Sequence, residues 1–376
     1  MITQIVATGS YLPEKVVKNE DLKQFPASSI PLIATKTGVM ERRHAAENEC
    51  TSDLAVEAAR RCLSRAGIAA SDLDGIILAT SSPDQPMPAT CSMVQAKLEA
   101  WQAFAFDVNA VCTSGIYAMR MADAMIRAGQ AQRLLVVAAE LYSRFLNPTD
   151  FSTYPYFGDG AGAMLLEGAE QASRPYIQGG VLHADGRGAD LIRIAAGGSR
   201  LPLAKMTDPR QQYFQMNGRA VFEFAVTRGA EVIEELCRAH SVPKEQVRHL
   251  VLHQANTNVL TTIAQKTGLP IERFSLRVFA HPVIQGTEVE KAKGHIWMLV
   301  TQGRLPYFEC LLEKRFGFRV SALFLIDHGH VLHCEGNIRV LFAEAGAFDI
   351  QRPFIGLQSR LELPHRVVEI GQVVQT

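Results

Sequence analysis

The amino-acid sequence predicts an α/β fold in which helices cover both faces of a sheet. Continuous apolar runs at 76–79, 103–108 and 134–139 are typical of strands that are buried on both faces. Helical patterns at 52–67 and 114–128 alternate with these runs. A similar pattern recurs later in the chain. This alternation of helices and strands indicates the α/β class.

Single residues define the ends of the two predicted helices. Thr51 and Ser52 are common helix N-caps, and Gly67 and Gly129 are of the kind that ends a helix. The charged residues of the second helix occur at spacings of three and four, so they share one stripe. They are Arg120, Asp123 and Arg127. We therefore expect the rest of the second helix to be apolar and buried.

An internal repeat predicts two similar halves. When residues 61–82 are shifted by 174 positions, five apolar residues fall on apolar residues without a gap. The pairs are Ile68 with Val242, Leu73 with Val247, Ile76 with Leu250, Ile77 with Val251, and Leu78 with Leu252. The repeat predicts a first half at 1–170 and the start of a second half at 171–274, with a join near 168–178.

The composition changes after Phe274. The residues beyond it hold six of the eleven histidines and a single asparagine, Asn337. A complete second half would repeat the strand and helix around Cys112 near residue 286, and that pattern is not present there. We therefore expect the second half to be incomplete or replaced after about residue 274, with 275–376 as a divergent tail of unknown fold.

Charge and composition exclude several classes of protein. The 38 basic and 38 acidic residues balance, so the chain lacks the positive charge that binding to nucleic acid or an anionic membrane needs. The 47% share of hydrophobic residues excludes wholesale disorder. Seven cysteines without a CxxC pair indicate a reducing compartment. Since the sequence also shows no signal peptide or apolar span, we expect a cytoplasmic protein.

Cys112 is the first candidate catalytic residue. It lies between the apolar run at 103–108 and the helix at 114–128, so we expect its thiol at a strand-to-helix turn. The helix dipole and free backbone N–H groups there favour the thiolate, which is the nucleophilic form. A buried, inert cysteine is the alternative. That alternative fits Cys62 and Cys237, which lie on the apolar sides of their helices.

His253 is the second candidate. It ends the apolar run at 250–252, at the carboxyl end of a predicted strand, where α/β sheets bind ligands. The residue is therefore placed to act as an acid–base group. A core histidine whose ring is fully hydrogen-bonded is the alternative. Asn256 precedes a predicted helix at 257–266, and we interpret it as the N-cap of that helix.

Two further motifs have only part of a ligand-site pattern. The glycine-rich stretch at 158–163 lacks the preceding strand and the spacing of a nucleotide-binding loop. We interpret it as a tight turn into a strand. The run from Asp327 to Cys334 contains three histidines, but its spacing matches no common zinc site. The sequence therefore predicts no metal site.

Five short segments occur in order along the chain: IVATGSYLP at 5–13, KTGVMER at 36–42, DVNAVCTSG at 107–115, FGDGAGA at 157–163 and HQAN at 253–256. Together they resemble the β-ketoacyl-acyl carrier protein synthase III family of thiolase-fold enzymes. The resemblance runs from about residue 2 to about residue 274, and the tail does not match. It implies a duplicated, five-layered αβαβα sandwich, which agrees with the internal repeat.

The resemblance implies a two-step reaction. The family cysteine at the position of Cys112 takes an acyl group from a thioester primer. The family histidine at the position of His253 helps to bind a malonyl thioester and to stabilise the enolate as CO₂ leaves, together with an asparagine of a later Gly-Asn-Thr motif. The implied reaction is a decarboxylative Claisen condensation with malonyl-acyl carrier protein, in fatty acid or polyketide-type biosynthesis. No cofactor is implied.

The resemblance also implies binding residues. The segment that contacts the acyl carrier protein corresponds to Gln254, Ala255, Asn256, Thr257 and Asn258. Lys36 stands at the family position of an arginine that neighbours the cofactor-stacking tryptophan, and is a further expected binding residue. Met87 falls where the family places a primer-pocket residue that comes from the partner subunit of a homodimer. A homodimer is therefore expected.

Four positions depart from the family's pattern. A cofactor-stacking tryptophan and three arginines are replaced by Leu32, Lys36, Phe151 and Asn258, respectively. The loss of an aromatic stack and three guanidinium groups favours acyl carrier protein over coenzyme A as the primer donor. In addition, no asparagine lies between Phe274 and Gly336. Two alternatives therefore stay open: acyl transfer without decarboxylation, and a catalytically impaired member that acts as a binding or dimer partner.

Overall fold

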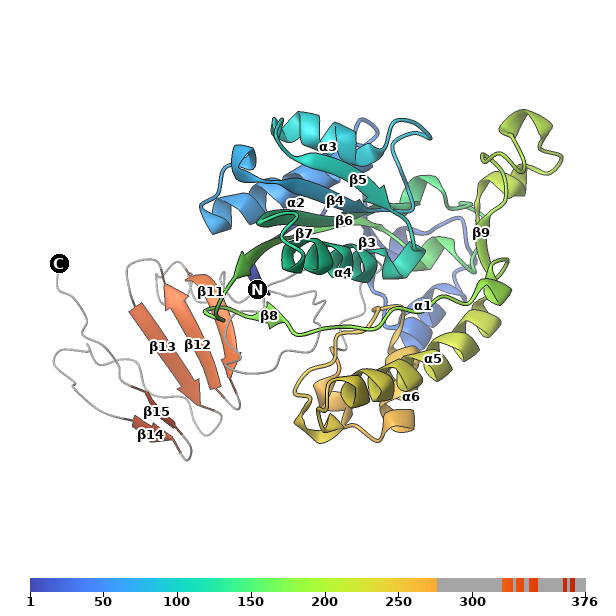
Figure 1. Cartoon of the computed structure of the whole chain (residues 1–376). Helices are drawn as coiled ribbons and strands as arrows, with labels where there is room; N and C mark the ends of the chain where they lie inside the picture. Colours follow the sequence, from blue (N-terminus) through green and yellow to red (C-terminus); the bar gives the residue numbers. More distant parts are fainter. Residues whose placement is uncertain (276–319, 327–328, 335–337, 344–360, 364–365, 369–376) are drawn as a thin grey trace. The chain divides into compact units, whose positions relative to one another are not determined.

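The computed structural model describes residues 1–275 and five strands of the remaining chain (Figure 1). The chain divides into two compact units, of which the first contains residues 1–275 and the second contains these five strands. The strands are β11 (Val320–Ile326), β12 (Gly329–Cys334), β13 (Ile338–Ala343), β14 (Leu361–Leu363) and β15 (Arg366–Val368).

A six-stranded sheet forms the centre of the first unit. Its strand order is β5-β4-β6-β7-β1-β8. β4 pairs in parallel with β5 and β6, whereas β7 pairs antiparallel with β6 and β1, and β8 pairs antiparallel with β1. The strands are β1 (Ile2–Tyr11), β4 (Gly75–Ala79), β5 (Phe104–Val108), β6 (Arg133–Leu141), β7 (Asp159–Ala169) and β8 (Tyr176–Ile177). The three predicted strands are confirmed as β4, β5 and β6.

Helices cover both faces of this sheet, as predicted (Figure 1). The helices are α2 (Thr51–Ala66) and α3 (Thr90–Leu98) on one face and α4 (Ser114–Arg127) on the other. Alternate residues of β4 face the two layers: Ile76 and Leu78 lie in the core beneath α2 and α3, and Ile77 lies in the core beneath α4. Because both faces are covered, the whole strand is apolar.

The two predicted helices differ in how closely their ends match the structure. The N-cap of α2 is Cys50, whose backbone N–H donates to Asp53 Oδ2 at 2.9 Å, and Thr51 is already helical. The prediction of Thr51 or Ser52 as the cap was therefore wrong by one residue. In α4 the predicted charged stripe is present. Its buried Asp123 accepts a hydrogen bond from Arg127 Nε at 2.7 Å.

Smaller elements surround the sheet. The strands β2 (Lys15–Lys18) and β3 (Glu41–His44) form one antiparallel pair, and β9 (Ile192–Ile194) and β10 (Phe214–Met216) form another. The remaining helices are α1 (Ile30–Thr37), α5 (Gly218–Ala239) and α6 (Thr257–Thr267). α5 and α6 share a hydrophobic core with Leu250 and Phe274. Leu250 and Phe274 form an isolated parallel β-bridge with each other. The predicted strand at 250–252 is therefore reduced to this one bridge.

The second unit contains two separate antiparallel arrangements. β11, β12 and β13 form a three-stranded sheet, and β14 pairs with β15. Of the histidine-containing run, residues 329–334 form β12, while Asp327 and His328 lie outside the described residues. Residues 276–319, where the second half was expected to end or change, also lie outside them. The division into parts at 1–170, 171–274 and 275–376 stays a prediction.

No helix in the described part of the chain combines the length and the apolar character that crossing a membrane requires.

Gly9 provides a test of the packing between β1 and α2. A Cβ atom at Gly9 would lie 2.3 Å from the backbone oxygen of Ala58 and 2.4 Å from the backbone nitrogen of Cys62. Because backbone atoms of a buried helix cannot move aside cheaply, we expect Gly9→Ala to lower the free energy of unfolding by about 3 kcal/mol. Urea unfolding followed by circular dichroism measures the loss. Gly186→Ala, where the added Cβ meets no atom within 4 Å, is the matched control.

Candidate active site

Cys112 lies in a tight turn between β5 and α4. A short 3₁₀ turn, Val111–Thr113, contains the cysteine, and α4 begins at the next residue. Ser114 fixes this turn, because its hydroxyl donates to the Val111 carbonyl at 2.7 Å and accepts from the Ala110 N–H at 2.6 Å. The sulfur therefore lies beside the N-terminus of a 14-residue helix. The predicted strand-to-helix position of Cys112 is confirmed.

The backbone beside the cysteine is strained. Val111 has a φ angle of +51°, in the left-handed region that β-branched residues rarely adopt. Asn109 Oδ1 accepts a hydrogen bond from the Val111 N–H at 3.1 Å and supports this conformation. Strain of this kind costs about 1 to 3 kcal/mol and persists where the surrounding fold imposes it, often at functional sites. Here the surrounding fold holds the Val111 backbone in this conformation, directly before the cysteine.

His253 is the partner of Cys112. The histidine precedes α6, and its side chain forms a hydrogen bond with the Cys112 side chain. The two residues are separated by 141 positions in the sequence, and the fold brings them together. Cys112 and His253 are both solvent-exposed, so a substrate can reach the sulfur. The pair has the composition of an activated cysteine nucleophile.

Each member of the pair shifts the ionisation of the other. Desolvation raises the pKa of the Cys112 thiol, but the charge and the hydrogen bond of His253 lower it by more, so the pKa lies below its usual value. Desolvation lowers the pKa of His253, whereas the charge and the hydrogen bond of Cys112 raise it above its usual value. Both shifts favour a thiolate beside an imidazolium.

A buried carboxyl group, Glu140, lies near this pair and was missed by the sequence analysis. It stands near the end of β6, and desolvation raises its pKa to about 7. Its charge acts to raise the pKa of the Cys112 thiol. A signal was available in the sequence, because Glu140 is an acidic residue close to the carboxyl end of an otherwise apolar strand.

The predicted carrier-binding segment contacts α1. Thr257 Oγ1 donates to the carbonyl of Thr37 at 3.4 Å, and Asn258 Nδ2 donates to the carbonyl of Lys36 at 3.0 Å. The structure thus brings together residues near 36 and residues near 257, which the sequence analysis had assigned separately. Asn256 Oδ1 accepts from the Val259 N–H at 2.9 Å, which confirms Asn256 as the N-cap of α6.

The other predicted binding residues differ in their surroundings. Gln254 is buried, and its Nε2 donates to the Leu252 carbonyl at 3.1 Å. The Ala255 and Lys36 residues are exposed. Met87 is 83% exposed in the loop between β4 and α3. Within one chain, therefore, the Met87 side chain is almost free of packing contacts.

Two of the residues that depart from the family's pattern also have clear positions. The Phe151 ring packs edge-on against Phe25, with ring centroids 5.2 Å apart, in a cluster that also contains Ile33 and Val39. Leu32 is partly exposed on α1. Phe151 therefore contributes to local packing, and neither side chain offers the charge or the stacking surface that the family uses at these positions.

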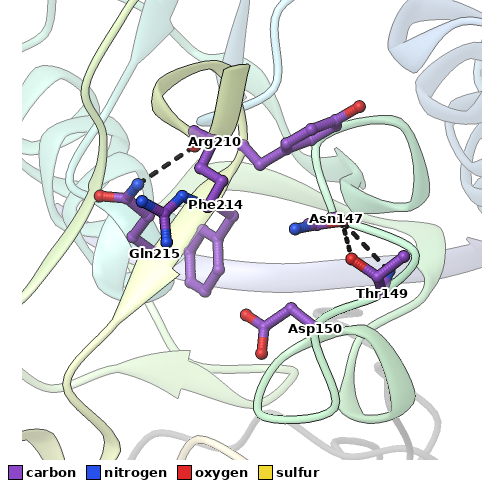
Figure 2. Close-up of a pocket in the computed structure, with 7 residues that line it drawn as sticks. Asn147, Thr149, Asp150, Arg210, Phe214 and Gln215 are labelled. Atoms are coloured by element: carbon purple, nitrogen blue, oxygen red, sulfur yellow. Dashed lines mark hydrogen bonds between the residues drawn. The ribbon is translucent and has the colours of Figure 1, made fainter. Parts of the chain in front are cut away.

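A pocket of about 310 Å³ lies away from this pair (Figure 2). Residues of the loop that follows β6 line one side, and residues around β10 line the other. They are Asn147, Thr149, Asp150, Arg210, Tyr213, Phe214 and Gln215. The Phe214 ring packs edge-on against Tyr142, with centroids 5.4 Å apart. Neither Cys112 nor His253 lines this pocket.

Within the described residues, no group of three histidine, cysteine or carboxylate side chains is arranged to hold a metal ion.

Comparison with known proteins identifies the family. The family model for 3-oxoacyl-[acyl-carrier-protein (ACP)] synthase III matches residues 106–186, which include Cys112. A relative from Rhodospirillum centenum, named β-ketoacyl-[acyl-carrier-protein] synthase III, is 42% identical over 316 residues, covering 83% of this chain and 94% of its own. The chain belongs to the β-ketoacyl-acyl carrier protein synthase III family. A second synthase III relative, from Rhizorhabdus wittichii, is 39% identical with similar coverage, 83% and 95%.

Solved structures of synthase III proteins share the fold. The Aquifex aeolicus enzyme has a TM-score of 0.66 at 32% identity, covering 86% of this chain and 94% of its own. The Thermus thermophilus enzyme has a TM-score of 0.67 at 37% identity, covering 74% and 85%. The predicted thiolase-like α/β class is therefore confirmed. The match with the Rhodospirillum centenum relative includes more of the chain than residues 1–275 make up, so it continues past residue 274.

Proposed function

We propose that this synthase III family member loads an acyl group from a thioester primer onto Cys112 and then condenses it with malonyl-acyl carrier protein, with loss of CO₂. The observation that carries the proposal is the Cys112–His253 pair beside the N-terminus of α4. Mass spectrometry of the products from an acyl thioester and malonyl-carrier protein tests it. A 3-oxoacyl-carrier protein is the expected product, and its absence at every primer length would contradict the proposal.

The first step uses the charge state of the pair. The Cys112 thiolate attacks the carbonyl carbon of the primer, and the bond from that carbon to the donor's sulfur breaks. The departing thiolate takes the proton of the His253 imidazolium, which lies beside it. Acylation leaves a neutral imidazole, because the charge that raised the pKa of His253 is then gone.

The second step uses the neutral imidazole as a hydrogen-bond donor. As the malonyl carboxylate leaves as CO₂, negative charge develops on the thioester oxygen, and the His253 N–H stabilises it. The resulting carbanion attacks the acyl carbon on Cys112, and the carbon–sulfur bond breaks to restore the thiolate. The lack of an asparagine between Phe274 and Gly336 favours a second candidate, acyl transfer without decarboxylation.

The primer donor in this proposal is acyl carrier protein rather than coenzyme A. Phe151 is packed against Phe25, Leu32 is aliphatic, and Asn258 is engaged with the Lys36 carbonyl. None of these side chains supplies a guanidinium group or an aromatic stack for coenzyme A. Lys266 of α6 and Arg219 of α5 are exposed cations, and Arg219 also pairs with Glu223 at 3.1 Å. These two residues are the candidate contacts for an acidic carrier.

We expect acylation to be several-fold faster from acyl-carrier protein than from the matching acyl-coenzyme A. Stopped-flow or quenched-flow acylation at two salt concentrations measures both rates. Lys266→Glu should slow the reaction with the carrier, because charges at the rim of an interface mainly change the association rate. The same change should leave the reaction with acyl-coenzyme A nearly unaffected. Equal rates from both donors, independent of salt, would count against this choice.

A homodimer completes the proposal. Among the strands that the structure describes, β5 is the outermost on its side of the sheet and pairs with β4. Trp101, just before β5, is 65% exposed, and Met87 is 83% exposed. An open strand edge beside exposed apolar side chains is typical of a surface that pairs with another chain. Its pairing with a second copy would place Met87 against the partner, where the family has its primer pocket.

The dimer is tested by sedimentation equilibrium. We expect the native chain to sediment as a dimer and Trp101→Asp to shift the equilibrium toward monomer, because a carboxylate replaces the apolar contact. Leu203→Asp, at a 59% exposed apolar residue outside the β5 edge, is the matched control. An equal effect of both substitutions would contradict an interface at β5.

The five cysteines in the described part of the chain, Cys50, Cys62, Cys91, Cys112 and Cys237, are free thiols. Their state supports the proposal of a reducing, cytoplasmic location.

A further inference from the structure

Glu140 is the most unusual titratable group outside the Cys112–His253 pair. It is 6% exposed, at the end of a strand whose other central residues are apolar. A buried carboxyl group is costly unless hydrogen bonds satisfy it. Its surroundings therefore show what it does for the fold and for the neighbouring thiol.

Two serines in the loop after β4 bind this carboxyl group. Oε1 accepts from the Ser81 N–H at 2.8 Å and from the Ser81 hydroxyl at 2.7 Å. Oε2 accepts from the Ser82 hydroxyl at 2.5 Å, and the Ser82 oxygen in turn accepts from the Leu141 N–H at 2.9 Å. Glu140 thus ties the carboxyl end of β4 to the carboxyl end of β6.

This connection extends to the nucleophile turn on one side. Thr80, which directly precedes the two serines, donates its N–H to the carbonyl of Val108 at 3.1 Å. Val108 ends β5 and begins the short segment that leads to Cys112. The loop that Glu140 holds is therefore hydrogen-bonded to the strand that supports the nucleophile.

On the other side, the network reaches an aromatic layer. The Tyr142 hydroxyl and the Ser81 hydroxyl are 2.8 Å apart and share a hydrogen bond. The Tyr142 ring stacks on Phe157 with centroids 5.6 Å apart. Desolvation and the charge of Glu140 raise the pKa of Tyr142 well above its usual value, and the charge of Cys112 acts in the same direction. Tyr142 therefore stays a neutral donor.

We propose that Glu140 is a positioning residue for Cys112, holding the β4 and β6 ends together through Ser81 and Ser82 while its own charge state regulates how readily the thiol ionises. This inference rests on the proposed role of Cys112 as the nucleophile. The titratable groups that face Glu140 are Cys112 before α4, Tyr142 after β6, and His253 before α6 through its bond to Cys112.

The direction of the regulation follows from charge. When the Glu140 carboxyl group is protonated, it carries no negative charge that would oppose the Cys112 thiolate. When the carboxyl group ionises, its negative charge disfavours the thiolate. Since the pKa of Glu140 is about 7, this change falls in the physiological range. The interacting groups titrate as a set, so the whole pH profile is the quantity to measure.

The test is the rate at which iodoacetamide alkylates Cys112 in the full-length protein, followed by peptide mass spectrometry from pH 5 to pH 9. The native profile should contain an inflection near pH 7 from Glu140. Glu140→Gln keeps the size of the side chain and cannot ionise, so this inflection should disappear. At pH 8 the variant should react about threefold faster or more. Glu167→Gln is the matched control, because Glu167 of β7 is a partly exposed glutamate that pairs with Arg133. This variant should keep the native profile.

A second variant separates regulation from simple damage to the fold. Ser81→Ala removes the hydroxyl that donates to the carboxylate and keeps the backbone N–H donor, so it should raise the pKa of Glu140 and move the inflection to higher pH. A purely structural role for Glu140 would lower the alkylation rate at every pH without changing the shape of the profile, and that result would overturn the proposal. Alkylation requires no substrate, so it is independent of the proposed condensation. If Cys112→Ala were acylated normally, the proposed function would fail instead.

Discussion

Replacing Cys112 with alanine is expected to abolish formation of the acyl-enzyme. Native protein incubated with an acyl thioester should gain the mass of one acyl group, and Cys112→Ala should gain none. The expected loss is complete, because the sulfur itself forms the covalent bond. Intact-protein mass spectrometry measures both. An adduct that persists in Cys112→Ala would assign the chemistry to another cysteine.

The other described cysteines explain why one substitution should suffice. Burial raises the pKa of Cys62 and of Cys91 to about 12, so both remain protonated thiols. Desolvation and a hydrogen bond to Asp53 also raise the pKa of Cys50. In contrast, His253 lowers the pKa of Cys112. Cys50→Ala, at a partly exposed thiol, is therefore the matched control and should be acylated at the native rate.

The same contrast predicts the pH dependence. Because the pKa of Cys112 is lowered, its thiolate persists at pH values where ordinary thiols are protonated. Removing the imidazolium in His253→Ala takes away the cause of the lowering, and desolvation and the charge of Glu140 then raise the pKa of the thiol. Acylation by that variant should therefore require a higher pH.

The strand-end positions of Cys112 and His253 could be predicted from the sequence, because both follow short apolar runs that the structure assigns to strand-like segments. A position at the end of such a run can be recognised from neighbouring residues alone. The pairing of the two side chains across 141 positions could not be recognised in this way. The resemblance to the family gave each residue a role in one reaction, and the structure shows their hydrogen bond. The N-cap role of Asn256 was also predicted correctly, since a cap depends on the next three residues only.

Glu140 could not be interpreted from the sequence, because its hydrogen-bond partners lie 58 and 59 residues earlier in the chain. A carboxyl group near a strand end is usually exposed, and only the fold shows that two serines satisfy it. The contact between Asn258 and the Lys36 carbonyl depends on the fold in the same way. The helix N-cap at Cys50 was missed for a local reason: cysteine is rarely a cap, and here the acceptor is the Asp53 carboxylate.

The second large expected effect is on the rate of decarboxylation, which depends on the hydrogen-bond donors available to the enolate. His253 is the donor that the described residues place beside Cys112. The family pairs this histidine with an asparagine, and this chain has none between Phe274 and Gly336. Losing one preorganised donor typically costs about 3 to 4 kcal/mol, or about a hundredfold to a thousandfold in rate.

We therefore expect this chain to form the acyl-enzyme readily but to release CO₂ from malonyl-carrier protein about a hundredfold to a thousandfold more slowly than a relative that has the asparagine. Radiolabelled CO₂ release by the purified native chain measures this rate, and His253→Ala should remove what activity remains. A chimaera that carries a family-type tail after Phe274 should recover the relative's rate. Release by the native chain at the relative's rate would show that another group supplies the second donor. If CO₂ release is absent while acylation is intact, the reaction is acyl transfer alone, because acylation needs only Cys112, His253 and α4, all of which lie before residue 275.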